Sequence, residues 1–296
     1  MQMTDRRFVA ILLLPAGLFL SAFVAYPLFL LLRDSLFEVS IYAPTEGVFV
    51  GLDNYAKALT SKRVLESAGR TLNYTLIALI AEFVLGFGAA LLFHALGDRS
   101  ELLRTIFAFP LMIPPIVAGL LWRFMLIDNI GIVNHLLETL GIIADSSDIS
   151  WLGDRDLVLF SVALPNIWLT TSFVALVLYT GLQNIPEELV EAAKIDGAGA
   201  WHMFLRVILP LLRPVIAVVL IIRGIDAARA FDMIWIQTEG GPRFASEILS
   251  IHIYRNMIRY GNVGEASAIA TLFMFSMVIV SAAVFFTIWG RGTSQS

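Results

Sequence analysis

GLQNIPEELVEAAKIDGAGAWHMFLRVILP, residues Gly181–Pro210, separates two long apolar runs and has the pattern of a small structure of its own. Pro186 suits the first turn of a helix, where its missing N–H is no loss, and the helix dipole favours the two acids that follow it. Gly197 can end that helix in a left-handed conformation, and Ala200–Leu209 can form a second helix before Pro210. This stretch is therefore predicted to be a helix–turn–helix.

The predicted helix pair has an apolar side, which the charged residues of the stretch avoid. The members of this side are Leu189, Ala192, Ala193, Leu205, Val207 and Leu209. A short amphipathic helix at a membrane surface can dock into a groove of a partner protein, or it can lie on the lipid and complete a helix bundle. The spacing of the residues leaves both interpretations open.

The chain as a whole is too apolar for a soluble protein. Of its 296 residues 58% are hydrophobic and 15% are charged, and the mean hydropathy is +0.81, whereas a soluble domain carries about 25% charged residues. The runs long enough to cross a bilayer are Phe8–Leu32, Leu72–Leu96, Thr105–Ile127, Leu157–Leu182, Val215–Thr238 and Ala266–Trp289. Unpaired backbone polar groups are costly in lipid, so these runs are predicted to be helices. We expect an all-α integral membrane protein with six transmembrane helices in one transmembrane domain, residues 1–296.

The first apolar run, Phe8–Leu32, is too long for a signal peptide, whose apolar region has about 7–15 residues. Residues Ala22–Ala25 weakly resemble a cleavage site. We nevertheless expect this run to remain in the protein as a spanning helix.

Composition and missing motifs narrow the function further. The chain has no cysteine, its four histidines lack the spacing of metal ligands, and its net charge of −4 indicates no nucleic-acid partner. It contains neither the Gly-x-x-x-x-Gly-Lys-Ser/Thr loop that cradles ATP phosphates nor a Gly-x-Ser-x-Gly or His-Glu-x-x-His motif. We therefore expect no metal, no bound cofactor and no enzymatic activity in this chain. Energy for any active transport must come from another subunit.

The fifth run carries four charges of alternating sign, Arg223, Asp226, Arg229 and Asp232, spaced three residues apart. An ionisable group at membrane depth costs roughly 2.5–3.5 kcal/mol and normally faces the inside of a bundle or a wet cavity. Neighbours three residues apart on a helix can also pair with each other. Two interpretations stay open: a self-neutralising ladder that orients the helix, or the polar lining of a solute path in a cavity near the bilayer midplane.

Polar residues also interrupt the second and fourth runs. Asn166 and Trp168 stand in the fourth run, where an aromatic ring beside hydrogen-bonding groups suits the face of a sugar, although Trp168 can equally be a packing residue. Glu82, in the middle of the second run, is expected to make a structural hydrogen bond between helices. Together with the charges of the fifth run, Asn166 and Trp168 make up the predicted solute path.

The helix–turn–helix stretch resembles the EAA motif of ABC-importer permeases, which reads Glu-Ala-Ala, three residues, Gly, nine residues, Ile-x-Leu-Pro. Glu191-Ala192-Ala193, Gly197 and Leu209-Pro210 match this motif, and Val207 stands where Ile is usual. In that family the loop is the coupling helix, seated in a cleft of the cytoplasmic ATPase subunit. The resemblance implies that residues 183–213 form a cytoplasmic coupling loop. Its implied ATPase-coupling residues are Glu191, Ala192, Ala193, Asp196, Gly197, Leu209 and Pro210.

The likeness extends over nearly the whole chain. The chain is similar to the carbohydrate-importer permeases of the maltose and glycerol-phosphate type, specifically to the first of their two permease subunits. The matching pieces are Tyr26-Pro27, Gly51–Tyr55, Glu82–Gly86, Leu103-Arg104 with Pro110, Leu121–Arg123, Trp168, Phe231-Asp232 and Gly264–Ala268. The chain departs from the family's Thr-Gly-Gly-Gly-Pro at Glu239, which lacks the backbone freedom of glycine.

This resemblance implies the permease of a type I ABC importer that brings a sugar or sugar-like solute into a bacterial cell through the inner membrane. The implied partners are a second homologous permease, two cytoplasmic ATPase subunits that bind ATP and Mg, an extracytoplasmic solute-binding protein and membrane lipid. Lys and Arg are spread too evenly over the connections to orient the chain, so only the coupling motif places both termini in the cytoplasm. The alternative is a secondary transporter or channel that works by itself, although we find no internal repeat that supports it.

Overall fold

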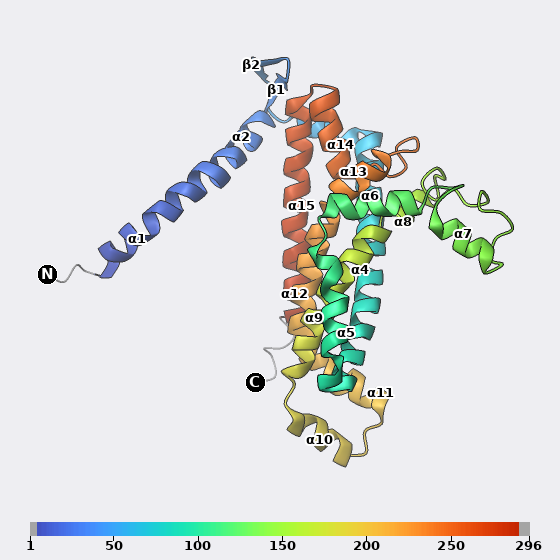
Figure 1. Ribbon diagram of the computed structural model, residues 1–296. Coiled ribbons are helices and arrows are strands. Elements are labelled where there is room, and N and C mark those ends of the chain that lie inside the picture. The colour runs from blue at the N-terminus through green and yellow to red at the C-terminus, as the bar shows by residue number, and fades with distance from the viewer. Residues whose placement is uncertain (1–4, 290–296) are drawn as a thin grey trace. The chain divides into compact units, whose positions relative to one another are not determined.

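The computed structural model of the protein describes residues 5–289, and Figure 1 shows the order of the elements. The chain forms two compact units. The first unit ends at Leu65 and also takes in His252–Ser276, and the second comprises Glu66–Ile251 with the residues from Met277 onward. Three helices, α4 (Lys62–Leu96), α14 (Leu249–Tyr254) and α15 (Val263–Trp289), contain residues of both units.

The first unit begins with a long apolar helix. α1 (Asp5–Leu20), a π-helical turn (Ser21–Ala25) and α2 (Tyr26–Asp34) follow one another without a break. The span Leu12–Asp34 has 23 residues and none of its most apolar window is buried. At 1.5 Å per residue this length matches the hydrocarbon core of a bilayer, about 30 Å. The predicted first spanning run is thus a helix, and the described residues do not cover it.

A two-stranded antiparallel sheet follows α2. β1 (Phe37–Ser40) pairs with β2 (Ala43–Phe49), with Phe37 opposite Phe49 and their ring centroids 5.3 Å apart. Aromatic and β-branched side chains favour strands, and a cross-strand aromatic pair stabilises a hairpin. The prediction of an all-α protein is therefore wrong for this connection, because its polar composition hid a short strand pattern.

Helix α3 (Asp53–Thr60) is joined to the hairpin by a buried amide. Nδ2 of Asn54 donates to the carbonyl oxygens of Ser35 and Phe37, at 3.0 and 2.9 Å. Two carbonyls between α2 and the sheet are thus satisfied by a side chain rather than by water. Later in the chain, α14 (Leu249–Tyr254) leads through a π-helical turn (Arg255–Arg259) into α15.

The second unit is a helix bundle. α4 continues through a 3-10 turn (Gly97–Ser100) into α5 (Glu101–Ala108) and a further 3-10 turn (Phe109–Met112). α9 (Leu164–Gln183) and α12 (Leu209–Ala228) pack with α4 around apolar side chains that include Phe87, Phe93, Val174, Leu178 and Leu212. A Cβ at Gly86 would lie 2.8 Å from side-chain atoms of Val174, so the glycine lets α4 and α9 approach closely.

The third apolar run is not one spanning helix, contrary to the prediction for Thr105–Ile127. The chain is extended at Ile113 and Pro114, with ψ of 127° and 137°, and α6 (Pro115–Met125) starts afresh. The cause is the Pro-Pro sequence, since a residue that precedes a proline is driven out of the helical region. With 11 residues, α6 is about 16 Å long and too short to cross a bilayer alone.

The fourth and fifth apolar runs are also divided. α8 (Val158–Ser161) ends before α9, and α12 ends before α13 (Asp232–Thr238), with Phe231 in an irregular conformation between them (φ −139°, ψ −61°). In the described part of the chain, five helical stretches are long and apolar enough to span a membrane: Leu12–Asp34, Lys62–Met112, Leu164–Gln183, Ala200–Thr238 and Val263–Ile288. Six separate crossings therefore stay a prediction.

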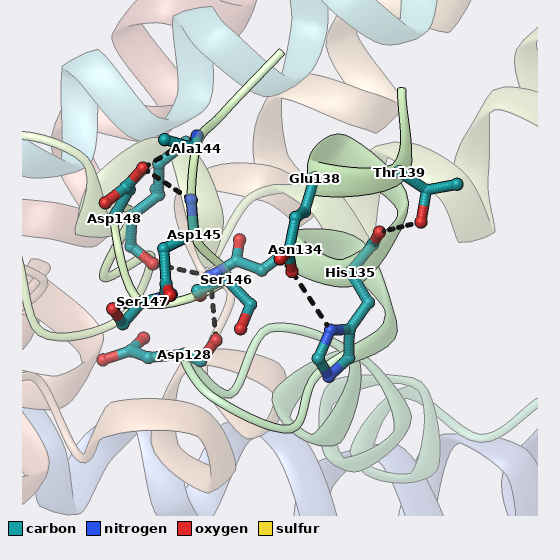
Figure 2. Close-up of polar contacts among 11 residues, drawn as sticks. Asp128, Asn134, His135, Glu138, Thr139, Ala144, Asp145, Ser146, Ser147 and Asp148 are labelled. Carbon is teal, nitrogen blue, oxygen red and sulfur yellow. Dashed lines mark hydrogen bonds and ion pairs between the residues drawn. The ribbon is translucent and has the colours of Figure 1, made fainter. Parts of the chain in front are cut away.

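The connection between α6 and α8 is an ordered loop built on Asn134 of α7 (Ile132–Thr139), as Figure 2 shows. The Nδ2 atom of this buried amide lies 3.0, 2.6 and 2.8 Å from the carbonyl oxygens of Asp128, Ser146 and Ile149. Because buried carbonyls need donors, this one side chain joins three separate points of the loop.

Two aspartates complete the loop in Figure 2. The hydroxyl and the backbone N–H of Ser147 both donate to Asp145, and these bonds lower the pKa of that carboxyl below its ordinary value. Asp148 accepts from the backbone N–H groups of Ala144 and Asp145, each at 3.0 Å. The loop is therefore organised by its own side chains.

The turn after α13 contains the residue that departs from the family pattern. Glu239 has φ +51° and its backbone N–H donates to the carbonyl oxygen of Trp235 at 2.9 Å. The left-handed region costs an L-residue roughly 1–2 kcal/mol. Glu239 thus takes the type of conformation that glycine favours, although it lacks glycine's freedom.

Candidate functional site

A buried ion pair joins α4 to α12. Glu82 is fully buried, and its carboxylate accepts from Nε of Arg223 at 2.9 Å and from Nη2 at 3.3 Å. The Arg223 side chain is 7% exposed. This two-bond geometry is the strong form of an arginine–carboxylate contact. The expected interhelical hydrogen bond of Glu82 is present, and its partner is a charge of the fifth run.

The charges of the fifth run form a ladder that continues from this pair toward the surface. Asp226, one turn after Arg223, accepts from its Nη1 at 3.2 Å, and the other oxygen of Asp226 accepts from Nη2 of Arg229 at 2.7 Å. The exposed fraction of the side chain rises from 36% at Asp226 to 68% at Arg229. The ladder predicted from the alternating signs is therefore present up to Arg229.

The break between α12 and α13 opens a pocket of about 360 Å³ beside this ladder. Helix α12 ends at Ala228, so Arg229 and Phe231 belong to the irregular connection and Asp232 starts the next helix. The polar lining consists of Asn166, Thr170, Arg223, Asp226, Arg229 and Asp232, and the apolar lining includes Leu169, Phe231 and Met233. The ladder and the pocket coexist, so the two interpretations of the charges are compatible.

Asn166 and Trp168 separate in the structure. Asn166 is buried and accepts from Nη2 of Arg223 at 3.4 Å, which joins it to the charged pocket. Trp168 lines a different, mainly apolar groove of about 710 Å³, where its ring lies 6.4 Å from the ring of Trp122. Residues two apart on a helix point in different directions. Trp168 is therefore not a member of the charged pocket, against the grouping predicted from the sequence.

Phe231 is one of several lining residues that were not predicted from the sequence to belong to the path. Its ring lies 5.5 Å from that of Trp235, and the two rings are stacked at 13°. The signal available in the sequence was its position directly before Asp232. This position indicates that Phe231 belongs to the pocket only if one knows that the helix breaks between Ala228 and Asp232.

The helix–turn–helix stretch forms a pair of helices as predicted. α10 (Glu187–Ile195) starts after Pro186, and α11 (Ala200–Met203) starts after Gly199. Gly197 has φ +79°, and its backbone N–H and that of Ala198 donate to the carbonyl oxygens of Lys194 and Ala193, both at 3.0 Å. This closes the end of α10 in the left-handed manner expected of a glycine.

The second helix of the pair does not end before Pro210, which corrects the boundary predicted for it. α11 passes through a π-helical turn (Phe204–Ile208) into α12, and the backbone N–H of Leu209 donates to the carbonyl oxygen of Phe204, five residues back. A proline lacks the N–H and crowds the preceding turn. The wider π turn accommodates Pro210 without ending the helix.

The turn between α10 and α11 borders a second pocket, of about 430 Å³. It is lined by Ala193, Asp196, Gly197, Ala198, Gly199, His202, Arg206 and Val207. Of the predicted coupling residues, Glu191 and Ala192 are exposed on α10 outside this lining, and Leu209 and Pro210 begin α12. The motif therefore presents an exposed helix and turn, followed by a long apolar helix.

The two pockets lie toward opposite ends of α12. Figure 1 places α10 and α11 at the end of the bundle remote from α6 and α13. α12 has 20 residues and is therefore about 30 Å long. One helix, α12, thus runs from the exposed turn to the charged pocket.

A family model described as "binding-protein-dependent transport system inner membrane component" matches residues 82–295. The chain is 33% identical to the sulfoquinovosyl glycerol transport system permease protein SmoG of Agrobacterium fabrum, over 96% of this chain and 91% of that protein. It is 37% identical to the trehalose/maltose transport system permease protein MalF of Thermococcus litoralis, over 77% and 75%. It is 34% identical to the trehalose transport system permease protein SugA of Mycobacterium tuberculosis, over 98% and 91%.

The fold agrees with that of a solved transporter. A chain of a bacterial ABC transporter involved in the import of the acidic polysaccharide alginate superposes with a TM-score of 0.81 at 21% identity, covering 98% of this chain and 97% of that one. With a family match over most of the chain and relatives above 30% identity along nearly all of it, this chain belongs to the binding-protein-dependent transport system inner membrane components, the permeases of ABC importers.

Proposed function

We propose that this chain is one of two permease subunits of an ABC importer for a sugar or sugar-like solute, and that the charged pocket belongs to the solute path. The observation that carries the proposal is the ladder of paired charges from Glu82 to Arg229, which opens into a pocket at a helix break. Non-helical backbone at membrane depth is tolerated where it lines a cavity. The named relatives transport trehalose, maltose or sulfoquinovosyl glycerol.

The proposed assembly adds a second homologous permease, two ATPase subunits that bind ATP and Mg, and a solute-binding protein outside the membrane. We propose that one permease chain supplies only part of the path. A related alginate transporter was solved in complex with its periplasmic protein. We further propose six crossings, with α5 and α6 together completing the third, and both termini in the cytoplasm.

The exposed turn between α10 and α11 is the proposed contact with the ATPase. Ile195 and Trp201 flank the turn with side chains that are 86% and 71% exposed. Large apolar side chains exposed this far are typical of a surface that a partner covers. Glu191, on the exposed side of α10, would accept a charge-assisted hydrogen bond from that partner. The other proposed coupling residues would determine the shape of this surface. They are Ala192, Ala193, Asp196, Gly197, Leu209 and Pro210.

Reconstitution tests the assembly. We expect the chain to co-purify with a permease partner and an ATPase, and the complex in liposomes to take up maltose or trehalose only when the binding protein and ATP are both supplied. This follows because the chain has no ATP-binding loop of its own. Uptake of solute by this chain alone, without ATP, would show that it is an autonomous transporter instead.

Substitutions in the ladder test the path. We expect Arg229→Ala to leave the complex folded and to reduce uptake roughly tenfold, because a charged hydrogen bond is worth about 1.5–3 kcal/mol and exposure weakens it. Asp226→Asn, which keeps the size and removes the charge, should impair uptake similarly. Arg99→Ala removes an exposed arginine outside the pocket and is the matched control for the loss of a positive charge. Unchanged uptake in both ladder variants of a folded complex would remove the pocket from the path.

A further inference from the structure

Helix α7 and the residues beside it expose five large apolar side chains. They are Ile130, Ile132, Leu136, Leu140 and Ile142, with exposed fractions between 54% and 74%. Ile132, Leu136 and Leu140 are spaced four residues apart, so they follow one another along one side of the helix. We call these three residues the apolar stripe of α7. An exposed stripe of this kind marks a surface that meets lipid or a partner protein.

The apolar stripe is held outward, because another side of α7 is fixed to the loop. Asn134 is buried, its Nδ2 atom lies close to three backbone carbonyl oxygens, and its Oδ1 atom accepts from Nε1 of Trp151 at 2.6 Å. Asn134 and Leu136 are two residues apart and therefore point in different directions. Leu136 cannot turn inward without breaking the hydrogen bonds of Asn134.

A third side of α7 is polar. His135 and Glu138 are exposed there, and Nδ1 of His135 lies 3.6 Å from a carboxylate oxygen of Glu138, as Figure 2 shows. The helix is therefore amphipathic on its outer surface, with an apolar stripe beside a polar one. A short helix of this kind suits the boundary between water and lipid, where each stripe meets its own solvent.

The place of α7 along the bundle agrees with that boundary. Figure 1 shows α7 beside the bundle, at the level of α6 and α8, with α10 and α11 at the opposite end. Directly after α8, Leu164 begins α9, which is long and apolar enough to span a membrane. The level of α8 is thus the level at which a membrane-spanning helix starts.

Two further observations favour lipid over a protein as the cover of the apolar stripe. Leu121 and Phe124 of α6 are also exposed, and only residues 126–131 separate α6 from α7, so apolar surface continues from one helix to the next along the chain. In Figure 1, α6 and α8 lie between α7 and α12. The stripe therefore does not border the charged pocket, where a second permease would complete the solute path.

We propose that α7 is an interfacial helix, whose apolar stripe enters the outer leaflet of the bilayer while His135 and Glu138 face water. Such a helix buries its apolar side roughly 5–10 Å into the boundary between headgroups and acyl chains. In this position α7 anchors the outer end of α6, which has 11 residues and cannot cross a bilayer alone. The inference rests on the proposed function only for which end of the bundle is outside.

Spin labels on single cysteines test the depth of α7, since the chain contains no cysteine. Leu136→Cys is labelled in the permease–ATPase complex in nanodiscs, and Glu138→Cys, on the polar side of the same helix, is the matched control. Paramagnetic resonance measures the collisions of each label with oxygen, which concentrates in lipid, and with a nickel chelate, which stays in water. We expect the ratio of oxygen to nickel collisions to be several-fold higher in Leu136→Cys than in Glu138→Cys.

The lipid composition of the nanodisc tests the nature of the contact. Residues 128–156 contain six acidic residues and one arginine, so they offer little attraction to anionic headgroups. The difference between the two labels should therefore be the same in phosphatidylcholine alone and with phosphatidylglycerol added. A difference that appears only with the anionic lipid would overturn the apolar contact.

The other results separate the inference from the function beneath it. Labels that favour the nickel chelate in both variants would place the apolar stripe in water and overturn the inference, even if the complex takes up maltose or trehalose normally. If the label in Leu136→Cys meets neither reagent, a protein covers the stripe and the inference also fails. That protein is the second permease if the protection exists without the binding protein, and the binding protein if its addition causes the protection. Absence of uptake by the unmodified complex would remove the proposed function and leave the lipid contact standing.

Discussion

Gly197→Val is expected to abolish ATP-driven uptake while the permease still folds and inserts. Gly197 has φ +79°, where a β-branched residue is a steric outlier, yet an added Cβ would meet no atom within 4 Å. The strain of roughly 1–2 kcal/mol therefore falls on the turn between α10 and α11 and not on the packed bundle. A rearranged turn moves Glu191 and α10 away from the ATPase surface to which we assign them.

Gly199→Val is the matched control, two residues further along the same turn. Gly199 has φ −66° and ψ 163°, an extended conformation that any residue adopts, and an added Cβ there also meets no atom within 4 Å. This variant should retain most of its uptake and its ATPase stimulation, with only a small loss from the weaker helix cap. Both activities are measured in proteoliposomes, and the unfolding midpoint reports folding. Normal uptake in Gly197→Val would exclude the turn from coupling.

The helices α10 and α11 could be predicted from the sequence because their signals are local. Pro186, the acids after it and Gly197 act on their own turns of the helix, and all three behave as expected. The end of the second helix was not predictable in the same way. Proline usually stops a helix, and only the π-helical turn at Phe204–Ile208 shows how α12 continues through Pro210.

The breaks in the apolar runs show a second limit on what can be predicted from the sequence. Hydropathy describes the run 105–127 as continuous, although Pro114-Pro115 contains the reason for the break. The break after Ala228 has no such local signal, since residues 229–231 include neither glycine nor proline. Because this break brings Arg229 and Phe231 into the pocket, their membership of the site could not be derived from spacing alone.

The sequence alone could not identify Glu82 as the main partner of Arg223. The alternating charges indicated pairs within α12, and those pairs exist. The stronger contact is with Glu82, which is 141 residues away along the chain. Only the packing of α4 against α12 brings the two together. A polar residue in the middle of an apolar run predicts that a partner exists but not which residue it is.

Glu82→Ala is expected to reduce severely the amount of folded permease and to lower its unfolding midpoint. The substitution leaves the guanidinium of Arg223, only 7% exposed, without its main partner. Removing one member of a buried ion pair typically costs about 3–5 kcal/mol, because the remaining charge stays buried and uncompensated. Assembly with a second permease can only bury this position further. The yield of monodisperse protein and its unfolding midpoint measure the effect.

Arg229→Met separates this effect from the general loss of a charge in the ladder. Arg229 and Arg223 both donate to Asp226, but the side chain of Arg229 is 68% exposed, so water can replace what is lost. This variant should fold normally. The double variant Glu82→Leu with Arg223→Met should recover most of the stability, since replacing a whole buried pair by apolar side chains is often neutral. If Glu82→Ala is no less stable than Arg229→Met, the Glu82–Arg223 pair does not hold α4 to α12.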